Sequence, residues 1–200
     1  MPLLTIPKIE ERLQAHEPLI PAMSQSTRQA AVAAILREGE SGTEALFIRR
    51  SERVGDIWSG HMAFPGGHRE EQDQDLQETA VRETREEIGL DLNVHARLLG
   101  HLDYIDVNPI GTTMQMIVAP YVYVLTGATP ELSPNHEVAD VLWGSIRDMY
   151  YGESHTSRDF HVRGQTQTFA GYGIEDQIVW GLTYRMLGQF FSILDPEWQQ

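Results

Sequence analysis

Residues 65–90 restrict the fold of this chain more than any other part of the sequence. The segment opens on a Pro-Gly-Gly tripeptide, where missing side chains allow the backbone to approach another group closely. Residues 76–89 then predict a helix that ends at its final glycine. At about 100° per residue, two adjoining sectors of this helix differ in character. One carries Glu83, Glu86 and Glu87, and the other carries Ala80, Val81, Thr84 and Ile88. The second sector can face a core, which leaves the first as an acidic face.

Three carboxylates on one helix face repel one another when nothing pairs with them. A divalent cation would remove that repulsion, and ligands that are all oxygen suit Mg²⁺ or Mn²⁺. Arg82 precedes Glu86 by four residues and could orient its carboxylate. The alternative is an acidic surface that only water contacts. The Gly-Gly loop just before the helix favours the metal site.

Strand and helix signals are mixed along the chain without a regular strand–helix–strand order, which predicts an α/β fold with a mixed sheet between helices. The expected strands are residues 30–36, 45–48, 62–64, 98–107, 114–125 and 138–143, the first two as a hairpin. The expected helices are a short one within 7–22, then 76–89 and 178–194. We expect two parts, an N-terminal helix with its linker over 1–26 and one domain over 27–200. The ring residues Tyr172, Trp180 and Tyr184 are interpreted as core, with stacking on adenine as the alternative.

Composition excludes several classes of protein. A chain of 200 residues suits one domain, and its zero cysteines exclude disulfides, zinc–thiolate sites and thiol catalysis. A formal net charge of −14 argues against nucleic acid as a partner. No apolar run has membrane-spanning length, and no signal peptide is evident, so we expect no membrane association and a cytoplasmic location.

The helix and its loop resemble the box of the Nudix hydrolase superfamily. The matching residues are Arg82-Glu83-Thr84-Arg85-Glu86-Glu87-Ile88-Gly89-Leu90. The preceding half departs from the box, because five residues after Gly67 stands Asp73 rather than glutamate, in a loop one residue longer. The resemblance implies an α/β/α sandwich that binds Mg²⁺ or Mn²⁺. The implied ligands are Glu83, Glu86 and Glu87, with the Gly67 carbonyl; Asp73 is left outside the site.

Residues 46–67 also resemble the extra signature of the coenzyme A diphosphatase branch. Arg50, Ser51, Gly60 and residues 64–67 match it, whereas the signature arginine falls at Gly55 and Arg53 is the nearest substitute. Arginine forks suit phosphate, so the substrate-binding candidates are Arg49, Arg50, Arg53 and Arg69. Either Arg49 or Arg50 could instead face solvent, since they alternate along a strand.

The resemblance implies hydrolysis of a diphosphate bond, most specifically of coenzyme A to phosphopantetheine and adenosine 3′,5′-bisphosphate. The expected catalytic residues are Arg82, Glu137 and two of the implied ligands, Glu86 and Glu87. The choice of general base among Glu86, Glu87 and Glu137 stays open. Other substrates compete: ADP-ribose, a nucleotide sugar or a nucleoside triphosphate. A nucleotide-binding module without catalysis is the alternative of another class. The expected partner is a small nucleoside diphosphate derivative, and a homodimer is left open.

Overall fold

A computed structural model describes residues 2–24, 26–53, 59–107, 115–162 and 165–199. Its larger sheet contains β1 (Arg28–Gly39), β2 (Gly42–Arg50), β3 (Met62–Ala63), β4 (Gly66–His68), β5 (Ala96–His101), β6 (Ile105–Val107), β7 (Met116–Leu125) and β8 (Val138–Ser145). Its smaller sheet contains β9 (His155–Val162), β10 (Gln165–Ile174) and β11 (Gln177–Trp180). The helices are the 3-10 turn η1 (Pro2–Leu4), α1 (Ile6–Ala15), α2 (Leu76–Ile88), α3 (Leu92–His95), α4 (Ile146–Tyr150) and α5 (Gly181–Leu194).

The larger sheet is mixed, as the sequence predicts. Its main path runs β3-β2-β1-β7-β5, and β4, β6 and β8 pair with β1, β7 and β2 respectively. The β1 and β7 strands are parallel, whereas β1 and β2 form the predicted antiparallel hairpin. Its two faces bury separate apolar clusters, because successive residues of a strand point to opposite sides. Along β1, Ala34 and Leu36 enter one cluster, whereas Ala33 and Ile35 enter the other.

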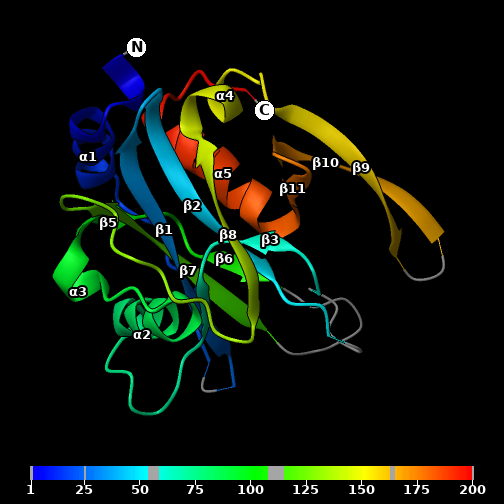
Figure 1. Ribbon diagram of the computed structural model, residues 1–200. Coiled ribbons are helices and arrows are strands. Elements are labelled where there is room, and N and C mark those ends of the chain that lie inside the picture. The colour runs from blue at the N-terminus through cyan, green and yellow to red at the C-terminus, as the bar shows by residue number, and fades with distance from the viewer. Residues whose placement is uncertain (1, 25, 54–58, 108–114, 163–164, 200) are drawn as a thin grey trace.

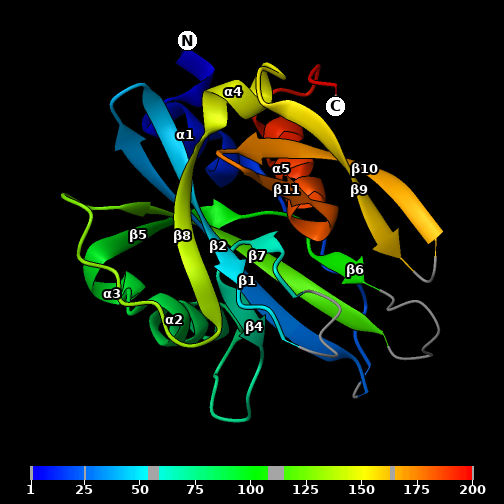
Figure 2. The ribbon, with the colours of Figure 1, turned by 45° about the vertical axis from the view of Figure 1, so that its right-hand side comes forward.

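Helices cover both faces of this sheet, which confirms the α/β/α sandwich. The apolar side chains of α1 and α5 pack into one cluster and those of α2 into the other. Figures 1 and 2 show α1 and α5 on the side of the sheet opposite to α2 and α3. The buried residues of α1 are Ile6, Ile9 and Leu13, so this helix packs within its own chain. None of the helices in the described ranges has the length and apolar character needed to cross a bilayer.

The structure corrects the predicted C-terminal helix and the strand before it. Residues 178–180 belong to β11, and α5 begins only at Gly181. The predicted strand over 98–107 is two strands, β5 and β6, interrupted between His101 and Ile105. Strand β7 begins at Met116; Met114, the first residue of the predicted strand, lies outside the described residues.

The β9–β11 sheet is absent from the prediction. Its exposed part is polar and carries no apolar alternation for a pattern to detect: every described residue from 155 to 159 and from 165 to 168 is exposed. Figure 1 shows β9 and β10 as a hairpin that projects away from the larger sheet.

Candidate active site

The Gly-Gly loop lies directly against β1. Gly66 pairs with Val32, and Gly67 pairs with Ala31. Gly66 has a φ of 153°, and a Cβ added there would lie 2.2 Å from the Ala31 carbonyl oxygen. Only glycine fits this position without a backbone shift. The loop therefore brings its amide groups to the surface on which α2 packs.

Helix α2 is capped at both ends, at the C-terminal end by the glycine that the sequence indicated. The Asp75 side chain accepts a hydrogen bond from the Glu78 amide at 2.8 Å, and this caps the N-terminus. Gly89 ends the helix with a φ of 72°, and its amide donates to the Arg85 carbonyl. Leu76, Ala80 and Ile88 are buried against the sheet. The acidic face is thereby turned toward the Gly-Gly loop.

The three box glutamates differ in exposure and in partner. Glu87 is 3% exposed, and its Oε2 accepts a hydrogen bond from the Gly66 amide at 2.9 Å. The Glu83 carboxylate lies beside Gly67, so close that a Cβ at Gly67 would meet it at 2.6 Å. The Glu86 side chain is 55% exposed. The structure thus places one buried, one half-buried and one accessible carboxylate along the loop.

Arg82 connects this glutamate face to the loop. Its Nη1 donates to Glu83 at 3.0 Å and to Glu86 at 3.2 Å, while its Nη2 donates to the His68 carbonyl at 2.8 Å. Its Nε and Nη2 also donate to the two oxygens of Asp73, at 2.9 and 3.0 Å. One guanidinium therefore orients two of the predicted ligands, which agrees with the orienting role expected for Arg82.

Asp73 anchors this arrangement, although its departure from the box pattern left it outside the predicted site. It is 3% exposed and accepts further hydrogen bonds from the Thr79 hydroxyl and the Glu70 amide. The Arg82 hydrogen bonds lower its pKa to about 2. Its signal was its position, five residues after Gly67, where the box has an acid. Aspartate has a shorter side chain than the glutamate of the box, and the loop that carries it is one residue longer; Asp73 nevertheless reaches Arg82.

Two carboxylates of this face are electrostatically unsatisfied. Burial raises the pKa of Glu87 to about 7, although the Gly66 hydrogen bond opposes that shift. Burial likewise raises the pKa of Glu83, against the effect of Arg82. The positive charges of the protein compensate these two carboxylates only in part. A bound cation would complete the compensation, and carboxylate oxygens are ligands that suit Mg²⁺ or Mn²⁺. Across the described ranges, no three acidic, histidine or cysteine side chains already form a closed cage, so ligand side chains would have to adjust.

Glu137 reaches the site from the loop before β8. That loop covers the end of α2, because the Asn135 amide donates to the Glu87 carbonyl at 2.8 Å and its side chain donates to the Glu86 carbonyl. The Glu137 carboxylate pairs with Arg53 at 3.0 Å, with both side chains about two-fifths exposed. Its charge is near enough to contribute to the raised pKa of Glu87. The structure therefore brings this predicted glutamate beside the box.

The four predicted arginines separate into different environments. Arg50 is near enough to Glu87 to favour the charged form of that carboxylate. Arg53 borders the site through its ion pair with Glu137. Arg49 lies on β2 opposite Met62 of β3.

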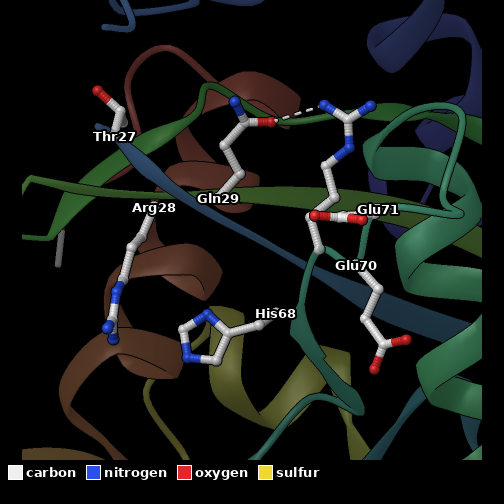
Figure 3. Close-up of a pocket in the computed structure, with 7 residues that line it drawn as sticks. Thr27, Arg28, Gln29, His68, Glu70 and Glu71 are labelled. Atoms are coloured by element: carbon white, nitrogen blue, oxygen red, sulfur yellow. Dashed lines mark hydrogen bonds between the residues drawn. The ribbon is translucent and has the colours of Figure 1, made fainter. Parts of the chain in front are cut away.

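Arg69 holds the loop itself rather than joining Arg50. It donates to the carbonyls of Asp73 and Gln74 at 3.0 and 2.8 Å, and to the Gln29 side chain at 3.0 Å. That contact with Gln29 is the dashed line in Figure 3, in an open pocket of about 470 Å³ beside the box. Most of its donors are thus already used within the loop.

Comparison with known proteins agrees with this geometry. Residues 27–163 match the model of the NUDIX domain. Nudix hydrolase 22 of Arabidopsis thaliana, described as chloroplastic, is 31% identical over 167 residues, which cover 80% of this chain and 53% of that one. The uncharacterised Nudix hydrolase NudL of Yersinia pestis is 30% identical over 151 residues, covering 74% of this chain and 72% of its own.

Longer relatives and a solved structure complete the comparison. The chain spans only 34% of an uncharacterised Schizosaccharomyces pombe protein to which it is 36% identical over 113 residues, and about half of the plant protein. A crystal structure of a binary complex of the C. elegans Ap4A hydrolase superposes with a TM-score of 0.51 at 21% identity. It covers 62% of this chain and 84% of that one, and it shows the shared fold. With the family model matching more than half of its length, this chain belongs to the NUDIX domain family.

Proposed function

We propose that this protein hydrolyses a diphosphate bond in a nucleoside diphosphate derivative, with Mg²⁺ or Mn²⁺ as its cofactor. The observation that carries the proposal is the arrangement of Glu83, Glu86 and Glu87 along the loop at Gly66 and Gly67. A diphosphate is itself an anion, and an acidic helix face can accept it only through an intervening cation. When bound, such a cation neutralises phosphate charge and lowers the pKa of a coordinated water.

The surroundings of each side chain indicate its proposed role. Arg82 holds the carboxylates of Glu83 and Glu86 in place as cation ligands, and the carbonyl of Gly67 is the proposed backbone ligand. Glu87 Oε2 already accepts from the Gly66 amide, which leaves its second oxygen for the cation. Water can reach the exposed carboxylates of Glu86 and Glu137. Glu86, Glu87 and Glu137 are the candidates for the general base that removes the proton from water.

Arg50 and Arg53 are the proposed contacts for substrate phosphates. Both lie on the side of the site where Glu137 and Glu87 meet, and guanidinium forks bind phosphate oxygens in pairs. Each would also stabilise negative charge that develops on the phosphorus being attacked. Arg69 contributes less in this proposal, because it is engaged with the loop carbonyls.

Coenzyme A is the proposed substrate, cleaved to phosphopantetheine and adenosine 3′,5′-bisphosphate. The support is the signature-like stretch over residues 46–67, whose Arg50 borders the box glutamates. Coenzyme A carries a phosphate besides its diphosphate, which would use a second arginine such as Arg53.

The test incubates the purified protein with Mg²⁺ and a panel of coenzyme A, ADP-ribose, NADH and nucleoside triphosphates, with products identified by mass spectrometry. We expect Mg²⁺-dependent cleavage of coenzyme A at its diphosphate. Glu86→Gln and Glu87→Gln should each lower turnover by about two orders of magnitude or more. Glu40→Gln is the matched control, since Glu40 is exposed in the turn between β1 and β2.

The outcomes separate the parts of the proposal. Wild-type turnover in both glutamine variants would refute the carboxylate assignment. Intact coenzyme A beside another cleaved compound would refute the substrate alone. Tight nucleotide binding with no cleavage of any compound would indicate a binding module instead of an enzyme.

A further inference from the structure

Four rings gather where the smaller sheet meets the end strand of the larger one. Phe160 stacks on Trp180 with ring centroids 3.9 Å apart and planes 22° apart. Phe169 lies 4.9 Å from Trp180, and His61 meets Trp180 edge-on at 4.6 Å. These four residues, His61, Phe160, Phe169 and Trp180, are termed the aromatic platform below.

The strand pairing places three of the rings on one face of the smaller sheet. Phe169 pairs with Arg158, which is two residues from Phe160, so Phe160 and Phe169 share a face. Trp180 pairs with Gly171, two residues from Phe169, and therefore lies on the same face. All four rings of the platform keep partial exposure to solvent.

The platform adjoins the candidate active site through His61. The His61 carbonyl accepts a hydrogen bond from the Arg50 amide at 3.0 Å. His61 is therefore paired through the backbone with Arg50, the arginine near Glu87. Strand β11, which ends in Trp180, lies against β3, the strand that follows His61. Figure 1 shows β3 and β11 next to each other below the projecting hairpin.

Two of the four platform residues lie outside the part of the chain that the family model matches. That match ends at residue 163, before β10, β11 and α5. The box glutamates and Arg50 lie inside it, whereas Phe169 and Trp180 lie outside. The platform therefore joins His61 and Phe160, inside the matched range, to Phe169 and Trp180, beyond it, next to the candidate active site.

We propose that the aromatic platform binds the nucleobase of the substrate by stacking. The inference rests on the proposed function, since it assigns a subsite to the same diphosphate substrate. Flat rings accept a planar π system with little dependence on its hydrogen-bonding edge, and stacking on an aromatic side chain contributes about 1–3 kcal/mol per base, a factor of about 5 to 150 in affinity. The platform would therefore fix the base while the arginines and the cation hold the phosphates.

The test measures binding of adenosine monophosphate and of ribose 5-phosphate by calorimetry, without turnover. The two ligands share a sugar phosphate and differ in the base. We expect Phe160→Leu and Trp180→Leu to weaken adenosine monophosphate binding at least about five-fold and to leave ribose 5-phosphate binding unchanged. Trp143→Leu is the matched control: this half-buried tryptophan lies on β8 and packs against Arg37, 3.9 Å from its ring.

Three results would overturn the assignment. The first is a pair of variants that lower the melting temperature but bind adenosine monophosphate as the unmodified protein does, since the platform would then only pack the hairpin. The second is an unmodified protein that binds the two ligands equally. The third is weakened binding of 4′-phosphopantetheine instead, which would assign the rings to the other end of the substrate. Hydrolysis is not measured, so failure of the proposed reaction would leave this result standing.

Discussion

Replacing Asp73 by asparagine removes the negative charge that holds Arg82 while keeping the size of the side chain. The Asp73 side chain is 2% exposed, and both of its oxygens accept hydrogen bonds from the Arg82 guanidinium. These hydrogen bonds lower its pKa from 3.8 to about 2. The unfolded chain therefore binds a proton at higher pH than the folded protein does, and the charged carboxylate stabilises the fold.

The size of this stabilisation follows from the pKa shift. A difference of nearly two pKa units corresponds to about 2 kcal/mol of folding free energy once Asp73 is fully charged in both states. The contribution is complete above about pH 5 and is lost as the pH falls through the folded-state pKa near 2. Integration between the two pKa values leaves about half of it at about pH 3.

Urea unfolding of the wild-type protein and Asp73→Asn measures this contribution directly. We expect the variant to be about 2 kcal/mol less stable near pH 7, and the difference to fall to about half near pH 3. Asp140→Asn is the control, because Asp140 is exposed and its side chain accepts a hydrogen bond from the neighbouring amide of Val141. Equal stability of the wild-type protein and Asp73→Asn near pH 7 would refute the role given to Asp73. A difference that does not change with pH would refute its electrostatic origin.

Three further substitutions test how the site and the fold are built. Gly66→Ala should lower the free energy of unfolding by at least about 2 kcal/mol in urea titrations, because the new Cβ meets the Ala31 carbonyl at 2.2 Å. Gly67→Ala should change stability by less than about 1 kcal/mol but lower the rate of diphosphate hydrolysis, since the three atoms nearest to the new Cβ all belong to the end of the Glu83 side chain, which would have to shift. An unchanged rate would argue against Glu83 as a ligand. Leu13→Ala should cost about 2–5 kcal/mol in thermal or urea unfolding, because α1 is part of the core; a smaller loss would make α1 an appendage.

The local parts of the fold and the site follow directly from sequence patterns. The β1–β2 hairpin is one such case, because its apolar residues are bounded by a turn at 39–42. Helix α2 is another, since Asp75 and Gly89 supply its ends and its apolar stripe selects the buried side. In each case the information lies within a few residues of the structure it specifies.

Elements whose residues carry a misleading pattern, or no apolar pattern at all, escaped prediction. Residues 178–180 have helical spacing with the residues that follow, but they pair with β10 and form β11 instead. The polar strands of the hairpin show no apolar alternation, and only their pairing over eight residues defines them. Asp73 was set aside because the box has a glutamate and a loop one residue shorter. A linear pattern does not show that an aspartate in a longer loop can reach Arg82.

The sequence by itself determined the acidic face of α2, the Gly-Gly loop before it and the class of reaction that they favour, because helical periodicity and glycine conformation act locally. Only the tertiary structure decided that Glu87 is buried against Gly66, that Arg82 is held by Asp73, and that Glu137 returns to the box from 50 residues further along the chain. It alone also separated Arg69, which holds the loop, from Arg50 and Arg53 beside the glutamates. Burial and charge proximity are set by which distant segments pack together, and no local pattern records them.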